Sequence, residues 1–190
     1  MKLDRILPFA KSLLEKAISN GDMVVDATLG NGHDTIFLAE LVGENGRVYG
    51  FDVQEEAILS SRERLMENGL LERVTLIHSG HENIYNQIPS IHHGKITGAI
   101  FNLGYLPGSN KTIVTKPETT IAAITQLLEI MAPEGIIVVV IYHGHPDGTL
   151  ERDSVVHYCQ QLDQKSAHVL QYQFINQQNH PPFIVAIEKR

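Results

Sequence analysis

The chain has 190 residues, of which 43% are hydrophobic, and carries a formal net charge of -7. This length fits one domain, residues 1–190, and is short for two ordinary ones. A single cysteine excludes a disulfide framework and a cysteine-rich zinc site, and the acidic balance argues against a protein that coats nucleic acid non-specifically.

The first half of the chain alternates between helical and strand patterns. Apolar residues at helical spacing between Ile6 and Ile18 predict an amphipathic helix. Charges interrupt this segment at regular intervals, so we expect neither a signal peptide nor a membrane span there, and we expect a cytoplasmic protein. The strands predicted next occupy residues 23–28, 46–53, 73–79 and 95–104. The helices predicted between them occupy residues 33–41, 54–69 and 81–88.

The second half predicts a helix over residues 117–133, a strand over 135–144 and a helix over 151–162. Two strand-like runs, 167–176 and 181–190, then follow with only a short polar loop between them, which makes them antiparallel neighbours. The predicted fold is a Rossmann-like, doubly wound α/β sheet of seven strands, with five parallel strands and a C-terminal antiparallel hairpin. A dehydrogenase would continue with another parallel strand and a substrate domain, so the hairpin favours a class I methyltransferase.

The turn after the first predicted strand has the pattern D-x-T-x-G-x-G, formed by Asp26, Thr28, Gly30, Asn31 and Gly32. Glycines here let backbone N–H groups and the next helix N-terminus approach a ligand without an intervening Cβ. The G-x-G-x-x-G fingerprint of dinucleotide binding is not satisfied. The alternative is a tight connection between strand and helix.

Acidic and histidine residues follow the next two strands. Asp52 comes about 20 residues after the glycine turn, where a carboxylate can accept both hydroxyls of a ribose. The alternative for Asp52 is an N-cap of the helix that begins at Gln54. After the third strand, His81 would lie beside an adenine, although many methyltransferases have an aspartate at this place. The alternative for His81 is a partly exposed residue at a helix N-terminus.

The stretch "IFNLGYLPGSNK" after the fourth strand resembles the N/D-P-P-Y loop of methyltransferases that act on exocyclic amines. In that loop the side-chain oxygen, here of Asn102, and the next backbone carbonyl orient the amine, while the aromatic ring stacks on the base. Leu103 and Gly104 replace the prolines, and Tyr105 supplies the ring. The alternative is a loop rich in glycine and proline with a packed tyrosine.

Histidines follow the fifth strand in "IYHGHPDG", where Tyr142, His143 and His145 are candidates for substrate contact or for accepting a proton from an attacking amine. No zinc-binding spacing accompanies them, so we expect no metal. The loop of the terminal hairpin is either a surface turn or a contributor to the same face.

Three lysines suggest a weak local basic patch for RNA. They are Lys95, Lys111 and Lys116. The alternative is an ordinary solvated surface.

Several short blocks in the same order resemble the bacterial YtqB/MnmM family, long described as rRNA methylases. The blocks are "VVDATLGNGHDT", "GFDVQ", "HSGHENI", "FNLGYLPGSNK", "IYHGHPDG" and "NHPPF". The first block also resembles the MraW-type rRNA methyltransferases, whose large inserted domain this chain lacks. The resemblance implies a methyltransferase that uses S-adenosylmethionine.

The resemblance further implies transfer of the methyl group to the amine of 5-aminomethyl-2-thiouridine at tRNA wobble position 34, giving 5-methylaminomethyl-2-thiouridine. The implied partner is the tRNA anticodon stem-loop, with no membrane and no DNA. The implied roles are methionine binding by Asp26, Gly30, Asn31 and Gly32, ribose binding by Asp52 and Gln54, adenine binding by His81 and Glu82, amine orientation by Asn102 and the Leu103 carbonyl, and base stacking by Tyr105.

Three other functions compete with this one. The nearest is a methyltransferase for rRNA, another RNA or a small amine, with the same cofactor site. An NAD-dependent oxidoreductase and a non-catalytic RNA-binding module are the others. A homodimer that assembles an RNA-binding surface is a further expectation for so small an acidic enzyme.

Overall fold

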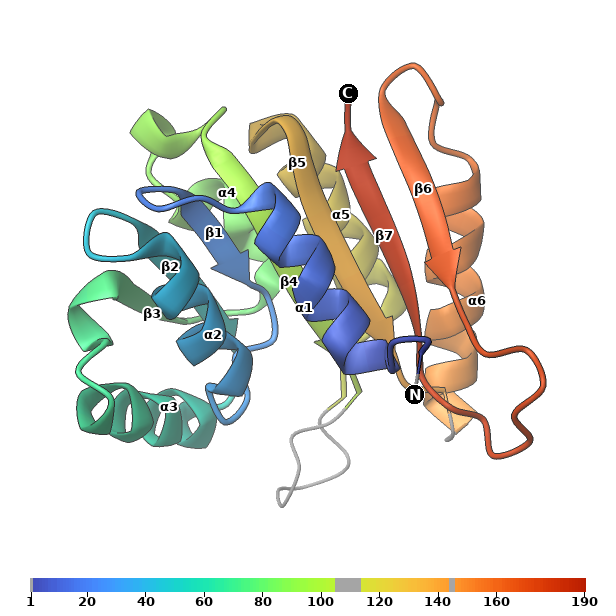
Figure 1. Cartoon of the computed structure of the whole chain (residues 1–190), viewed down its shortest axis with the longest axis horizontal. Coiled ribbons are helices and arrows are strands. Elements are labelled where there is room, and N and C mark those ends of the chain that lie inside the picture. The colour runs from blue at the N-terminus through green and yellow to red at the C-terminus, as the bar shows by residue number, and fades with distance from the viewer. Residues whose placement is uncertain (1, 105–113, 144–145) are drawn as a thin grey trace.

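The computed structural model describes residues 2–104, 114–143 and 146–190. Within these residues seven strands form one sheet in the order β3-β2-β1-β4-β5-β7-β6 (Figure 1). The strands are β1 Met23–Asp26, β2 Arg47–Asp52, β3 Val74–His78, β4 Ile96–Leu103, β5 Met131–Ile141, β6 Ala167–Tyr172 and β7 Phe183–Lys189. The first five are mutually parallel, and β7 is antiparallel to both β5 and β6. The predicted fold class, including its terminal hairpin, is therefore confirmed.

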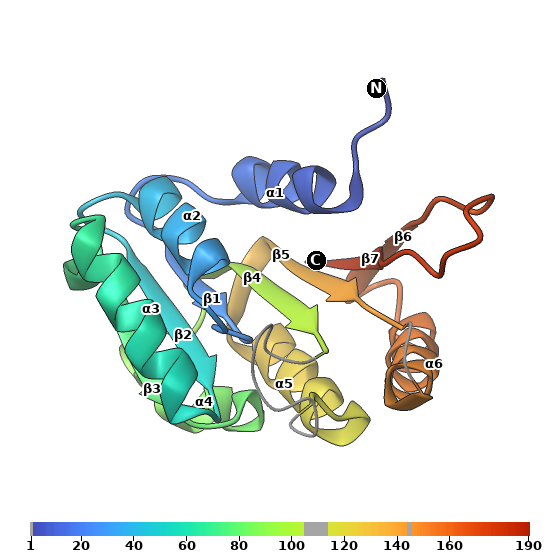
Figure 2. The ribbon, with the colours of Figure 1, turned by 90° about the horizontal axis from the view of Figure 1, so that it is seen from below.

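Helices cover both faces of the sheet (Figure 2). The α-helices are α1 Ile6–Ala17, α2 His33–Val42, α3 Glu55–Glu67, α4 Ile84–Gln87, α5 Pro117–Ile130 and α6 Pro146–Gln160. Short 3-10 helices are η1 Leu71–Arg73, η2 His81–Asn83 and η3 Ser90–His92. Helices α1, α2 and α3 pack on one face, and α4, α5 and α6 pack on the other (Figure 2).

Each face has its own apolar core, which explains why the central strands are continuously hydrophobic. On β4, Ile100 packs with Leu14 of α1 and Leu38 of α2, whereas the next residue, Phe101, packs with Ile124 of α5. Successive side chains of a strand point to opposite faces, so both sets of β4 residues must be apolar. Burial on two faces is what the uninterrupted apolar run predicted.

Several element boundaries differ from the prediction, most of all those around β5. Helix α5 ends at Ile130, and β5 begins at Met131, ahead of the predicted 135. Pro133 has no backbone N–H to donate to a helix hydrogen bond. Glu134 has a φ of 65°, and the pairing register of β4 with β5 shifts between Ile96 and Gly98. Helix α6 begins at Pro146 rather than at 151.

The topology places a ligand site at one edge of the sheet. From β1 the chain proceeds to β2 and β3 on one side and later to β4 and β5 on the other, so the strand order reverses between β1 and β4. The carboxyl ends of these strands meet at the lower edge in Figure 1. Ligands of doubly wound sheets bind outside this edge at the reversal point. Among the helices described, none is long and apolar enough to span a membrane.

Candidate functional site

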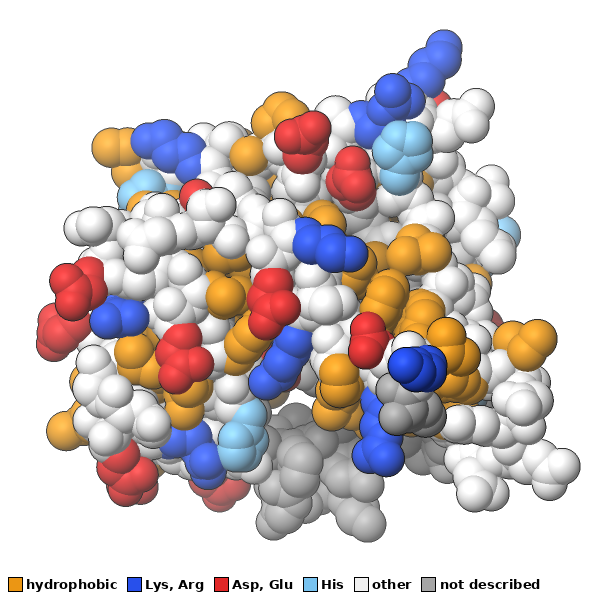
Figure 3. Space-filling model, in the orientation of Figure 1, with side chains coloured by type: hydrophobic (Ala, Val, Ile, Leu, Met, Phe, Trp, Pro, Cys, Tyr) orange, Lys and Arg blue, Asp and Glu red, His pale blue; other side chains and the backbone are white. Residues whose placement is uncertain are grey.

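A cavity of about 1540 Å³ lies at the carboxyl ends of the strands. It appears in the space-filling view as a hollow beside α1 (Figure 3). The predicted site residues that line it are Thr28, Gly30, Asn31, Asp52, Gln54, His81, Glu82, Asn102, Leu103, Tyr142 and His143. Asp26 and Gly32 lie behind this surface, and Tyr105 and His145 lie outside the described residues. The structure thus brings most of the predicted site together.

The glycine turn is held from two neighbouring elements. The Gly30 N–H donates to Oδ2 of Asp52 at 3.0 Å, and the Ser61 hydroxyl of α3 donates to the Gly30 carbonyl at 3.0 Å. Gly32 has a φ of 77°, and a Cβ there would lie 2.8 Å from Ser61 Oγ. Both the backbone conformation and the close approach of α3 therefore require glycine at this position. Ser61 has no signal in the sequence, because its partner is distant along the chain.

Asp52 orders the turn and also faces the cavity. Its Oδ1 accepts from the Gln54 N–H at 2.9 Å, while its Oδ2 accepts from Gly30. Each carboxylate oxygen has a second lone pair, so these two bonds leave acceptor capacity for ligand hydroxyls. Asp52 stands before the N-cap residue of α3, which is Gln54. The geometry is not that of the helix N-cap, and ribose binding by Asp52 stays a prediction.

Asp26 supports the turn from behind. It is 1% exposed, accepts from the Thr35 hydroxyl at 2.5 Å and accepts from the Thr28 N–H at 3.2 Å. Burial, together with the nearby Asp34 carboxylate, raises the pKa of Asp26 to about 7. Its described contacts hold the end of β1 against the first turn of α2. A direct contact with the methionine portion stays a prediction.

His81 is anchored to the end of β1. Its Nδ1 lies 2.9 Å from the Ala27 carbonyl, to which it must donate because a carbonyl only accepts. The ring stands edge-on to Phe101 with centroids 5.5 Å apart. Burial lowers the pKa of His81, against the opposing effect of the Ala27 hydrogen bond. His81 is therefore a neutral buried residue and not the partly exposed helix residue of the alternative.

Asn102 is held at both its backbone and its side chain. Its N–H donates to the Thr28 hydroxyl at 2.7 Å, and its Nδ2 donates to Oδ2 of Asp34 at 2.5 Å. A carboxylate can only accept here, so the amide nitrogen must face Asp34 and the amide oxygen faces away from it. Both residues line the cavity. Among the hydrogen bonds of the described residues, none reaches Oδ1 of Asn102, so within this part of the chain the oxygen remains available as an acceptor, which is what orienting an amine requires.

Tyr142 and His143 follow β5 at the opposite wall of the cavity. Tyr142 is 39% exposed, and its pKa is raised by burial and by Asp34. His143 is buried, with its ring 5.5 Å from that of Phe183 and 5.9 Å from that of His180. Burial and Arg152 lower the pKa of His143, which favours the neutral imidazole. His180 also lines the cavity, so the hairpin loop does reach this face.

Hydrogen bonds join Gly104 to Thr115, and a buried carboxylate in turn holds Thr115. The Gly104 N–H donates to the Thr115 hydroxyl at 3.1 Å, and the Thr115 N–H donates to the Gly104 carbonyl, also at 3.1 Å. Glu151 of α6 is 3% exposed and accepts from the Thr115 hydroxyl at 2.6 Å and from Thr120 at 2.8 Å. The sequence did not reveal this network, because Glu151 reads as an ordinary helix residue.

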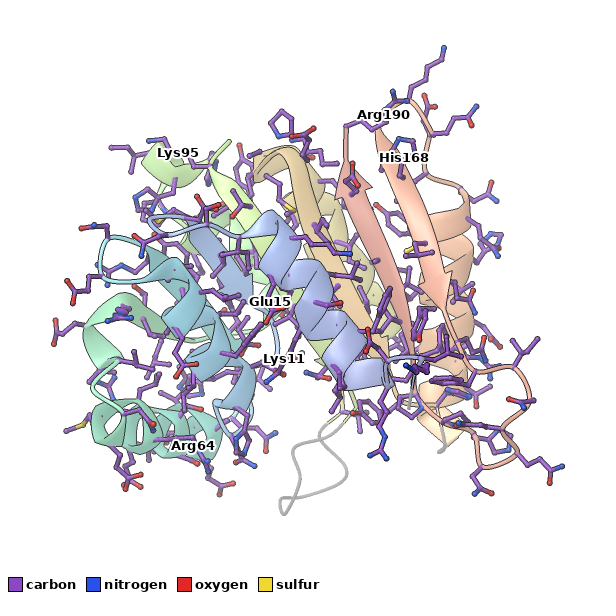
Figure 4. The ribbon with its side chains drawn as sticks, in the orientation of Figure 1. Lys11, Glu15, Arg64, Lys95, His168 and Arg190 are labelled. Atoms are coloured by element: carbon purple, nitrogen blue, oxygen red, sulfur yellow. The ribbon has the colours of Figure 1, made fainter. Side chains whose placement is uncertain are left out.

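The predicted lysine patch is wrong in part. Lys116 lines the cavity, but Lys95 stands before β4 at the opposite end of the sheet (Figure 4). Lys111 lies outside the described residues. The sequence reasoning also missed α1, from which Lys11 and Glu15 reach the cavity. Among the residues described, no group of three or more histidine, cysteine, aspartate or glutamate side chains is arranged to hold a metal ion.

A family model described as "Putative rRNA methylase" matches residues 48–188. The chain belongs to this family. A second model, for protein-L-isoaspartate(D-aspartate) O-methyltransferase, matches residues 5–90. The match confirms the predicted resemblance and, with the fold, the predicted family of methyltransferases dependent on S-adenosylmethionine.

Individual relatives agree with the family. A chloroplastic tRNA (mnm(5)s(2)U34)-methyltransferase of Arabidopsis thaliana is 33% identical over 92% of this chain, which spans 66% of the length of that relative. The crystal structure of an rRNA methylase from Clostridium thermocellum is 44% identical, covers all of both chains and has a TM-score of 0.96. A Streptococcus mutans methyltransferase in complex with SAH is 38% identical over 99% of each chain, with a TM-score of 0.89.

Proposed function

We propose that this protein transfers a methyl group from S-adenosylmethionine to the amine of 5-aminomethyl-2-thiouridine at wobble position 34, within the anticodon stem-loop of tRNA. The product is 5-methylaminomethyl-2-thiouridine. The observation that carries the proposal is the oriented amide of Asn102 near the end of β4, whose oxygen receives no hydrogen bond from the other described residues. The name of the Arabidopsis thaliana relative supports the acceptor.

The residues around the glycine turn fit the cofactor. Asp52 keeps acceptor capacity for the ribose hydroxyls, and Gln54 lies beside it on the cavity wall. Gly30 and Asn31 line the same cavity as Asn102, and we place the methionine portion beside them. Glu82 and the backbone around Gly80 line the part we assign to adenine. When bound, S-adenosylmethionine supplies a methyl carbon attached to a positively charged sulfur.

Asn102 aims the attacking nitrogen. Its side-chain oxygen and the Leu103 carbonyl accept hydrogen bonds from the amine, so that the nitrogen lone pair points along the line of displacement. An amine without such acceptors would rotate freely and spend little time in line. We also propose that Tyr105, which lies outside the described residues, stacks on the uridine.

Methylation of ribosomal RNA is the second candidate, because the family model carries that description. The two candidates share the cofactor site and differ in the acceptor. An oxidoreductase is disfavoured by the family match and by the antiparallel hairpin, and a non-catalytic module by the oriented Asn102 amide.

The deciding experiment incubates the protein with labelled S-adenosylmethionine and tRNA that carries 5-aminomethyl-2-thiouridine, followed by mass analysis of the nucleosides. We expect one added methyl at that nucleoside, and none on matched tRNA whose wobble uridine lacks the aminomethyl group. Ribosomal RNA is offered in parallel. Methyl transfer to a ribosomal base, with none to the tRNA, would overturn the wobble assignment in favour of the second candidate.

A further inference from the structure

The cavity contains a carboxylate to which the proposed function assigns no role. Asp34, in the first turn of α2, lines the cavity and is partly buried. Its Oδ2 accepts from Asn102, the residue that orients the amine. The sequence gives Asp34 an ordinary explanation, since acidic residues are favoured in the first turn of a helix. The contact with Asn102 across the sheet edge goes beyond that explanation.

Asp34 has no ion-pair partner among the described residues. The ion pair found among them joins Arg152 and Asp153. Charged side chains removed from water are normally paired. Lys11 points from α1 towards α2 (Figure 4), where its ammonium lies 4.6 Å from the centre of the Phe37 ring. A carboxylate without a paired cation, beside the acceptor for an amine, is complementary to an alkylammonium ion.

The groups that face Asp34 come from every element around it. Lys11 of α1 and His33 of its own helix favour its charged form, as does the hydrogen bond from Asn102, but burial outweighs them and raises the pKa of Asp34. The pKa values of Asp26 of β1 and Tyr142 after β5 are raised by burial and, as the second cause, by the Asp34 charge. Asp34 is thus a carboxylate whose proton affinity is increased by its surroundings.

We propose that Asp34 binds the ammonium form of the substrate amine and takes its proton, while it holds Asn102 with the amide oxygen towards the amine. This inference rests on the proposed function. One N–H bond of the ammonium breaks and the proton passes to the carboxylate. The freed lone pair then bonds to the methyl carbon as the carbon–sulfur bond breaks, with its electron pair retained by sulfur. The product is a secondary ammonium ion, and Asp34 releases its proton to water.

His143, which also lines the cavity, is an acceptor that the sequence pattern favoured. Its ring packs against Phe183 and His180 on the far wall, and none of its described contacts reaches Asn102. Asp34 shares a hydrogen bond with Asn102 and therefore lies one residue from the bound amine. Proton transfer requires hydrogen-bond reach. The geometry therefore favours Asp34.

Asp34→Asn separates charge from shape, because the new amide oxygen still accepts from Asn102. We expect its single-turnover methyl transfer at neutral pH to fall by about 100-fold. The defect should shrink as pH rises, since more of the amine is then neutral without help. Asp34→Glu, which restores a carboxylate, should recover part of the rate. Glu40→Gln, which removes an exposed charge from the same helix, is the matched control and should behave as the wild type.

A binding measurement keeps the test independent of turnover. With S-adenosylhomocysteine present, the wild type and Glu40→Gln should bind an anticodon stem-loop carrying the aminomethyl group about tenfold more tightly than one without it. Asp34→Asn should lose this preference. Melting temperatures establish that each variant is folded.

Two results would overturn the inference. The first is a rate defect in Asp34→Asn that is equal at every pH, with the binding preference kept. The second is a defect explained by weaker S-adenosylmethionine binding, which would make the amino group of the cofactor the cation that Asp34 holds. Failure of the wild type to methylate the amine would instead count against the proposed function itself.

Discussion

Asn102 shows how a single residue's chemistry depends on which way its amide points. Because Asp34 takes the amide nitrogen, the oxygen is left for the substrate. Replacement by alanine removes that acceptor and leaves the glycine turn and Asp52 in place. We therefore expect Asn102→Ala to lower single-turnover methyl transfer by about 100-fold, with the Kd for S-adenosylmethionine changed by less than about threefold.

Asn68→Ala is the control for this variant, since the Asn68 amide is exposed and bonds to the Arg64 carbonyl away from the cavity. It should leave both quantities unchanged. Equal losses of turnover and cofactor affinity in Asn102→Ala would contradict the role assigned to its side chain.

Asp26 predicts an unusual dependence of stability on pH. Its pKa is raised from 3.8 to about 7 in the folded protein, so the folded state holds the proton more tightly than the unfolded state does. This contribution to stability is fully present below about pH 4 and is lost as pH rises to about 7. Asp26→Asn removes the buried charge, and the Thr35 hydroxyl can rotate to suit an amide. We expect the variant to exceed the wild type in free energy of unfolding by about 1–3 kcal/mol at pH 8, with little difference at pH 4.

Denaturant unfolding across this pH range measures the difference directly. Asp4→Asn, which removes an exposed carboxylate, serves as the control and should show the pH dependence of the wild type. If the free energies of unfolding of the wild type and Asp26→Asn differ by the same amount at pH 8 and at pH 4, Asp26 is not buried in its charged form.

At the scale of elements, the packing of α3 against the glycine turn can be separated from backbone strain. Gly32 and Gly69 both have positive φ, but a Cβ on Gly69 meets open space whereas one on Gly32 meets Ser61. Gly69→Ala should therefore lose only about 1 kcal/mol of stability. Gly32→Ala should lose about 2–3 kcal/mol and also weaken S-adenosylmethionine binding, because α3 must shift away from the turn. Thermal unfolding and cofactor titration check both variants, and equal effects would contradict this account.

The same scale shows what the sequence could and could not predict. Apolar periodicity was enough for the strands and for the hairpin, and parallel strands bring Asp52 and Asn102 to one edge whatever their separation in the chain. The bulge at Glu134 depends on pairing with β4, which no local pattern contains. Asp34 and Ser61 act through partners 68 and 31 residues away, so their roles appear only after folding.

For the whole molecule, the distribution of charge matters more than its total. The net charge is -7, and the face beside α1 mixes acidic and basic side chains without a broad basic area (Figure 3). Binding of RNA by neutralisation of many phosphates is therefore not expected, and the base should contribute much of the affinity. We expect lysines to contact RNA only where the fold places them at the cavity. Lys116 satisfies this condition and Lys95 does not.

These two lysines make a matched pair for measuring phosphate contacts. Binding of the anticodon stem-loop should weaken with salt along a shallow slope, equivalent to about one to three phosphates. Lys116→Gln should reduce that slope by about one, because a phosphate contact and its released counterion are lost together. Lys95→Gln removes the same charge from the far end of the sheet and should leave the slope unchanged. Fluorescence anisotropy across a salt series measures the slope for each variant. Equal changes of slope in the two variants would show that overall charge, and not the rim of the cavity, governs RNA binding.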